Sequence, residues 1–118
     1  MNQTMHSFYM NGYLWLVRFV PPNSYMLVDR TGSLTIGATD PVTRTICLSN
    51  ELVGDKLETV LIHELAHCAM FSYGIIDDIR KMVSPENYIE AEEWICNFIA
   101  NYGVEILSTS IELLMNYT

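Results

Sequence analysis

Two histidines and a glutamate near the middle of the chain have the residue types and the spacing for metal chemistry. His63 and His67 are four residues apart. That is close to one helical turn, so on a helix both imidazoles project from the same face and can bind one Zn²⁺ together. Glu64 follows the first histidine and points to one side of that ion, where its carboxylate can take a proton from a water molecule. The pattern predicts a zinc site with Glu64 as the general base of a hydrolytic reaction.

The residues on both sides of this motif favour a helix that is partly buried. Residues 59–62 before it and 68–71 after it are uncharged and compatible with a helix, whereas a solvated surface helix normally carries Lys, Glu or Gln at such positions. The alternative interpretation is a pair of ordinary helix histidines beside a solvated Glu64. The uncharged flanks favour the metal site over that interpretation.

A catalytic zinc ion usually has three protein ligands and a water molecule, so a third ligand is needed. The only histidine outside the motif is His6, near the N-terminus, which leaves a carboxylate for this role. The acidic run Glu90-Ala91-Glu92-Glu93 begins 23 residues after His67, and the stretch between them is long enough to fold a second helix antiparallel to the first. We therefore expect the third ligand in this run.

Two glutamates of the run compete for the role. Glu93 shares a helical face with Asn97, whose amide can orient a ligating histidine through its second ring nitrogen, and with Ala100, which lets helices approach closely. Glu92 lies on the most apolar stripe of the same helix. Glu93 is the preferred third ligand and Glu92 the alternative, while at least one acidic residue of the run complements the positive end of the helix dipole.

The elements that must position these residues predict an α+β fold, a small N-terminal antiparallel β-meander packed on two main helices. Strands are predicted by β-branched, aromatic or alternating runs at 13–20, 25–28, 33–36 and 43–48. Helical spacing predicts one helix from about Asp55 to Tyr73, ended by Gly74, and a second from Ser84-Pro85 to about Tyr117, with a loop or short helical turn at 77–83. The second helix would span about 48 Å, more than the roughly 35 Å diameter of such a domain, so it must overhang, bend or break.

Size and charge restrict the function classes. The chain has 118 residues, half of them hydrophobic, which predicts one globular domain over 1–118 and excludes a disordered chain. Its net charge of −8 argues against nucleic-acid binding, which requires a basic surface to displace counterions from phosphates.

The cysteines and the apolar runs indicate the compartment. Cys47, Cys68 and Cys96 are an odd number without short paired spacing, so we expect free, buried thiols in a reducing cytoplasm. Residues 1–6 lack the basic start and the apolar stretch of a signal peptide, and the apolar run 13–20 is too short to cross a bilayer. These features predict a soluble, cytoplasmic protein that does not act at a membrane.

The motif followed by Glu93 on a later helix resembles the gluzincin plan of zinc peptidases. Over roughly residues 34–103 the chain is more closely similar to small bacterial and prophage-borne zinc peptidases, including the ImmA/IrrE type. The resemblance is carried by Gly37-x-Thr39-Asp40, Arg44-x-Ile46-x-Leu48, the motif helix and the run 92–101. It implies a zincin-like minimal metallopeptidase with His63, His67 and Glu93 as zinc ligands.

The predicted function is hydrolysis of peptide bonds in a peptide or protein substrate, with Zn²⁺ as the cofactor. An edge strand, for which 43–48 is the candidate, can receive an extended substrate by strand addition. One alternative is a catalytically silent zinc-binding domain that serves structure or protein interaction, in which the long last helix assembles chains into a homo-oligomer. Another is an enzyme with Fe or Mn at a site of two histidines and one carboxylate.

Overall fold

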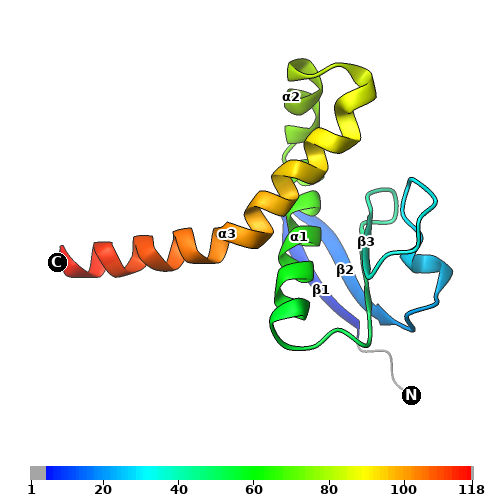
Figure 1. The fold of residues 1–118 in the computed structure, drawn as a ribbon, viewed down its shortest axis with the longest axis horizontal. Coiled ribbons are helices and arrows are strands. Elements are labelled where there is room, and N and C mark those ends of the chain that lie inside the picture. Colours follow the sequence, from blue (N-terminus) through cyan, green and yellow to red (C-terminus); the bar gives the residue numbers. More distant parts are fainter. Residues whose placement is uncertain (1–4, 118) are drawn as a thin grey trace.

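The computed structural model describes residues 5–117, which form an α+β fold of a four-stranded sheet and three α-helices (Figure 1). The strands are β1 (Met5–Met10), β2 (Tyr13–Val20), β3 (Gly37–Asp40) and β4 (Thr45–Ser49). The α-helices are α1 (Gly54–Ser72), α2 (Ile75–Met82) and α3 (Tyr88–Asn116), and two short 3-10 turns lie at Tyr25–Leu27 and Pro85–Asn87. The predicted α+β class is confirmed.

The sheet is mixed, so the prediction of an antiparallel meander is wrong. Its strand order is β1-β2-β4-β3. The outer pairs β1–β2 and β3–β4 are antiparallel, whereas the central strands β2 and β4 are parallel, with Leu16 opposite Thr45 and Val20 opposite Ser49. Segment 21–36 leads from the end of β2 to the start of β3 at the same end of the sheet. Strand β3 then runs back, and residues 41–44 turn the chain into β4, which is therefore parallel to β2.

Strand β1 and the turn that connects it to β2 were not predicted from the sequence. Asn11 and Gly12 connect β1 to β2 with φ of 50° and 79°. Positive φ at both central residues is the requirement of the tightest hairpin turn, and Asn-Gly is the sequence that meets it most readily.

The predicted strands 25–28 and 33–36 do not form, and the segment that contains them is largely irregular. It contains the 3-10 turn Tyr25–Leu27 and a single antiparallel bridge between Val28 and Leu34. Gly37–Asp40, where no strand was predicted, is the edge strand β3. The predicted strand 43–48 corresponds to β4, which begins two residues later and ends one residue later.

The two main helices lie close to their predicted bounds. Helix α1 ends before Gly74, whose φ of 71° lies in the left-handed region that glycine adopts without strain. The segment 77–83 is a helix of its own, α2, which buries Ile76 and Ile79. Among the described residues no single helix is long and apolar enough to cross a membrane; α1 and α2 meet that requirement only as a pair bent by 90°.

Helix α1 forms the middle of the molecule. One of its faces packs on the sheet in a core that includes Trp15, Ile46 and Leu48, and the other packs against α2 and α3 in a second core around Met70, Ile79 and Cys96. The residues of the histidine motif lie on α1 between these two cores. The three cysteines are buried and free, as predicted.

Helix α3 extends beyond the rest of the domain. Of the three possibilities that its predicted length left open, to overhang, bend or break, the structure has the first. Its 29 residues form one continuous helix whose C-terminal half projects away from the sheet and from α1 (Figure 1). The projection makes the radius of gyration 15.6 Å, compared with roughly 14 Å for a compact domain of this length.

Candidate metal centre

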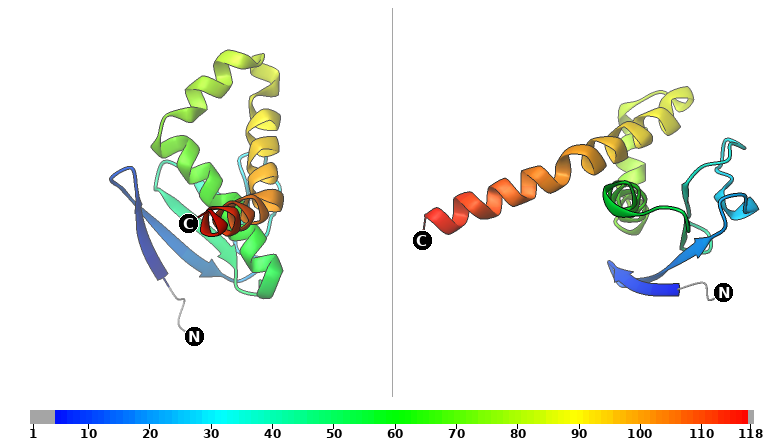
Figure 2. Two further views of the ribbon diagram at one scale, coloured as in Figure 1. Left: turned by 90° about the vertical axis from the view of Figure 1, so that its left-hand side faces the viewer. Right: turned by 60° about the horizontal axis from the view of Figure 1, so that its bottom comes forward.

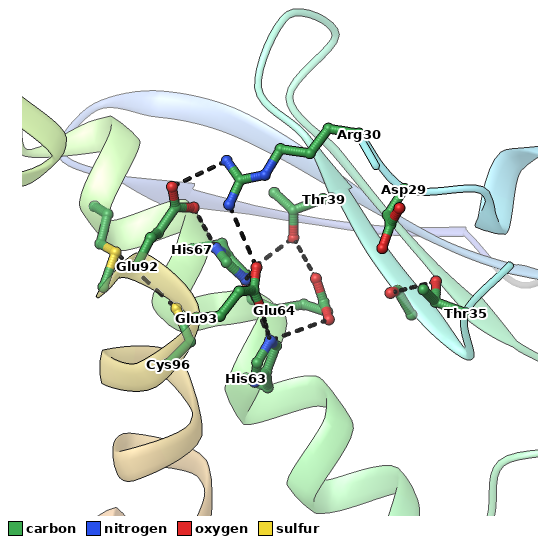
Figure 3. A network of polar contacts seen from close by, with 12 residues as sticks. Asp29, Arg30, Thr35, Thr39, His63, Glu64, His67, Glu92, Glu93 and Cys96 are labelled. Atoms are coloured by element: carbon green, nitrogen blue, oxygen red, sulfur yellow. Dashed lines mark hydrogen bonds and ion pairs between the residues drawn. The ribbon is translucent and has the colours of Figure 1, made fainter. Parts of the chain in front are cut away.

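Helices α1 and α3 bring three of the predicted site residues together. His63 and His67 come from α1, and Glu93 comes from the second turn of α3 (Figure 3). Their ligand atoms all lie within 4.8 Å of one another. These three residues can therefore hold a metal ion.

The donor atoms lie close enough to share a small ion. Nε2 of His63 lies 3.2 Å from Nε2 of His67 and 3.0 Å from Oε1 of Glu93. Nε2 of His67 lies 3.1 Å from the other carboxylate oxygen, Oε2 of Glu93. Ligands at about 2.0 Å from a tetrahedral Zn²⁺ are separated by about 3.3 Å, which the two histidine nitrogens already match, whereas the Glu93 carboxylate must turn for one of its oxygens to face both of them.

Glu92 lies against the other side of the His67 ring. Its Oε2 is 2.6 Å from Nδ1 of His67, and the side chain is almost completely buried. The sequence analysis assigned this kind of supporting contact to Asn97, which instead lines the cleft beside the site. A carboxylate on Nδ1 fixes the ring orientation and leaves Nε2 free to bind a metal ion, so Glu92 has a supporting position and not that of a ligand.

The guanidinium group of Arg30 bridges the carboxylates of Glu92 and Glu93. One guanidinium nitrogen donates to Oε1 of Glu92 at 2.9 Å, and the other lies 3.3 Å from Oε2 of Glu93. Arg30 lies in the irregular segment between β2 and β3, within a turn in which Asp29 accepts hydrogen bonds from the backbone of Thr31 and Ser33. The loop thereby compensates the negative charge that Glu92 and Glu93 would otherwise concentrate at one end of α3.

Glu64 lies beside the three donors without joining them. Its carboxylate is 5% exposed, its Oε1 accepts a hydrogen bond of 2.8 Å from the hydroxyl of Thr39 on β3, and its Oε2 lies 4.0 Å from Nε2 of His63. A Cβ on Gly37 would lie 2.7 Å from Val60 and 3.3 Å from Oε2 of Glu64, so the absence of a side chain there lets β3 approach α1.

The surroundings of the site shift the pKa values of the Glu64 and Glu93 carboxyl groups in opposite directions. Burial raises the pKa of Glu64, and the Thr39 hydroxyl and the nearby imidazoles offset only part of this rise. Hydrogen bonds from His63 and His67 hold the pKa of Glu93 far below its usual range. Glu93 is therefore a fixed negative charge, whereas Glu64 is the carboxylate that binds a proton more readily.

His67 carries the counter-charge of the site. Burial lowers its pKa, but contacts with Cys96, Glu92 and Glu93 outweigh this and raise the pKa to about 12. In the absence of a metal ion, the imidazole is thus a cation held between two carboxylates. A divalent cation that binds Nε2 takes over this role and displaces the proton.

The site opens into a cleft of about 1170 Å³. The cleft extends between β3, the segment of Arg30, helix α1 and the N-terminal half of α3, and its polar lining includes Thr39, Asp40, Lys56, Asn97 and Asn101. A tyrosine or an arginine often assists such catalysis by stabilising the oxyanion, but four candidates of these residue types are not among the described residues that line the cleft: Tyr73, Tyr88, Tyr102 and Arg80.

No protein-family model, curated protein or solved structure matches this chain. The site must therefore be interpreted from its own geometry.

Two residues of the site were not found from the sequence. Arg30 is 62 positions from Glu92, in a turn whose residue types predicted only a turn. Thr39 was noted only as part of the family resemblance, although its hydroxyl contacts Glu64. The one available signal was that an arginine next to a turn is suited to neutralising a pair of adjacent glutamates.

Proposed function

We propose that this chain is a zinc-dependent metallopeptidase in which His63, His67 and Glu93 hold the ion and Glu64 is the general base. The observation that carries the proposal is the convergence of two imidazole nitrogens and the Glu93 carboxylate within 4.8 Å of one another, with the buried carboxylate of Glu64 beside them. The fold and family that the sequence resembles, a zincin-like domain of the ImmA/IrrE type, imply this combination of residues. The donor set and the spacing support zinc over the larger oxygen-loving cations.

The four residues divide the chemistry between them. Zinc at this site would lower the pKa of a bound water and polarise the carbonyl of the scissile peptide bond. Glu64 accepts the proton of the attacking water, because burial has raised its pKa, and passes it to the leaving amine. Thr39 keeps the Glu64 carboxylate turned toward the cleft, and Glu92 keeps Nε2 of His67 directed at the ion.

An extended peptide has a place to bind. Strand β4, suggested from the sequence, lies between β2 and β3 and has no free edge. Strand β3 is an edge strand, lines the cleft, and carries the threonine that contacts Glu64. A substrate that adds to β3 as a further strand would place a peptide carbonyl next to the site, since main-chain hydrogen bonds fix its depth in the cleft.

The alternative is a zinc-binding domain without turnover. The cleft favours the enzyme, because a purely structural zinc site is normally closed by four protein ligands, whereas three donors here face an open volume of about 1170 Å³.

The test combines metal analysis with one substitution. The purified protein is expected to contain one zinc per chain and to cleave unfolded casein, and Glu64→Gln is expected to retain the zinc and lose hydrolysis. Turnover at the original rate in Glu64→Gln would refute the general-base role. Stoichiometric zinc without cleavage in the original protein would support the silent domain, and iron or manganese in place of zinc would refute the proposed cofactor.

A further inference from the structure

The C-terminal half of α3 has an apolar stripe that no other described part of the chain covers. Its members, which we call the tail seam, are 48, 65, 58 and 64% exposed in chain order: Val104, Leu107, Ile111 and Leu114. They recur at intervals of three, four and three residues, the spacing of a two-helix seam. Figure 2 shows from two further sides that this part of α3 stands clear of the body.

The tail seam continues the face by which α3 packs in the body. Ala100 and Cys96, one and two turns before Val104, lie on the same side of the helix and are buried. The same helical face thus changes from buried to exposed because α3 projects beyond the body (Figure 1), not because the residue types change. A helix of this composition gains most of its stability from packing an apolar face, so an uncovered seam is unfavourable in water.

We propose that the tail seam pairs with the tail seam of a second copy of this chain, in an antiparallel two-helix contact. This inference does not depend on the proposed function, since neither the zinc ligands nor the cleft takes part in it.

The residue positions are self-complementary about a two-fold axis at position 109. Val104 and Leu114 lie five residues on either side of it, and Leu107 and Ile111 lie two residues on either side. An antiparallel partner therefore places each apolar side chain opposite another, as a contact between identical surfaces requires. Position 101 then lies opposite position 117, so the projecting segments pair along about 24 Å and the two bodies remain at opposite ends.

The distribution of charge around the tail seam favours a second copy of this chain as its partner. The positions that flank the seam are uncharged (Gly103, Ser108, Ser110 and Met115), and the two glutamates of the segment, Glu105 and Glu112, lie on the other side of the helix. No like charges are brought together across the pair. Residues 82–118 contain no Lys or Arg, which is unfavourable for binding an anionic membrane surface.

The opposite stripe of the same helix is less suitable for self-association. It consists of Phe98, Tyr102, Ile106 and Leu113, and it is interrupted by Thr109. Glu105 and Glu112 border it, so pairing two copies through this stripe would place glutamates near one another. It supplies a matched control.

The test is sedimentation equilibrium of the purified protein from about 1 µM to about 500 µM. We expect a reversible dimer of twice the 13.5 kDa chain mass. The double variant Leu107→Asp, Ile111→Asp is expected to weaken the dimer at least about 100-fold, because it buries two charges in the seam. The control Ile106→Asp, Leu113→Asp removes similar apolar residues from the opposite stripe and is expected to remain dimeric.

A distance measurement tests the orientation. Asn116→Cys introduces an exposed labelling site, whereas the three native cysteines are buried. Asn116 lies one turn after Glu112, on the side of the helix away from the seam, so labels there sit on the outer faces of the two helices. The spin labels should therefore be about 30 Å apart in an antiparallel pair, which adds an axial offset of about 21 Å, and about 21 Å apart in a parallel one. A distance near 21 Å, a monomer at every concentration, dissociation by the control pair alone, or a monomer that binds phosphatidylcholine vesicles would each overturn the proposal.

Discussion

Oε2 of Glu92 lies 2.6 Å from Nδ1 of His67, on the side of the imidazole ring that faces away from His63 and Glu93. The two adjacent glutamates of α3 thus have different positions. Glu93 faces the histidine Nε2 atoms, and Glu92 holds one of the histidines from behind. The distinction arises because neighbouring residues on a helix point about 100° apart, so they can contact opposite sides of one ring on α1.

Substituting Glu92 tests this supporting role. Glu92→Gln keeps the size of the side chain but removes the charge that holds the ring, so we expect zinc affinity to fall about 10- to 100-fold while the stoichiometry remains one. Competition with a chromogenic chelator measures the effect. Glu90→Gln, an exposed change one turn from Glu93, is the matched control and should leave the affinity unchanged.

The raised pKa of His67 leads to a pH prediction. In the metal-free protein its folded pKa of about 12 exceeds the unfolded value near 6.5, so this contribution to stability is complete below pH 6.5 and is lost as the pH rises toward 12. Zinc must displace that proton, whereas Glu93 is already ionised. Apparent zinc affinity should therefore increase with pH between about pH 6 and pH 8.

Calorimetric titration of zinc in buffers of different ionisation enthalpy measures this linkage. At pH 7 we expect release of about one proton per zinc from His67. Glu92→Gln should release less, since it removes one of the contacts that raise the pKa. Zinc binding without proton release and without pH dependence would contradict the charge state assigned to His67.

The sequence was sufficient for the features that depend on local spacing. The placement of His63, Glu64 and His67 on one helix and the stop at Gly74 follow from helical periodicity and from glycine's access to positive φ. The Asn11-Gly12 hairpin turn also depends only on local sequence, and the Asn-Gly pair that favours it was present in the sequence but was not used to predict it.

The features that were missed depend on long-range packing. The parallel pairing of β2 with β4 joins segments almost 30 residues apart, and the residues of each strand are compatible with either direction. Which of Glu92 and Asn97 contacts His67 depends on how α3 is rotated about its own axis relative to α1. A helical wheel shows which residues share a face but not which face meets α1. Arg30 reaches the site because of the path of an irregular segment, for which the sequence has no periodic signal.

Gly37 is predicted to be essential for the approach of β3 to α1. In Gly37→Ala the new methyl group would lie 2.7 Å from Cγ1 of Val60, so strand and helix must separate. We expect a loss of about 1–3 kcal/mol in the free energy of unfolding, measured by urea denaturation. Val60→Ala makes room for the methyl group, so the double variant should be more stable than the sum of the two single effects predicts; strict additivity would contradict the steric explanation.

The indole of Trp15 is predicted to depend on Ser72 at the end of α1. Nε1 of Trp15 donates a hydrogen bond of 2.8 Å to the Ser72 hydroxyl, and both side chains are buried. Ser72→Ala leaves the indole N–H without this acceptor, and we expect a loss of about 1–3 kcal/mol in the free energy of unfolding. The carbonyl of Ser72, which accepts from Asn11, is unaffected by the change.

A double-mutant cycle separates this hydrogen bond from general packing. Trp15→Phe removes the donor, so Ser72→Ala should have a much smaller effect in that background than in the original chain. Ser33→Ala, an exposed change of the same kind, provides the baseline for losing a serine hydroxyl. An equal effect of Ser72→Ala in both backgrounds would contradict the prediction. The indole N–H is already absent in Trp15→Phe, so the hydroxyl would then stabilise the protein through a contact other than this hydrogen bond.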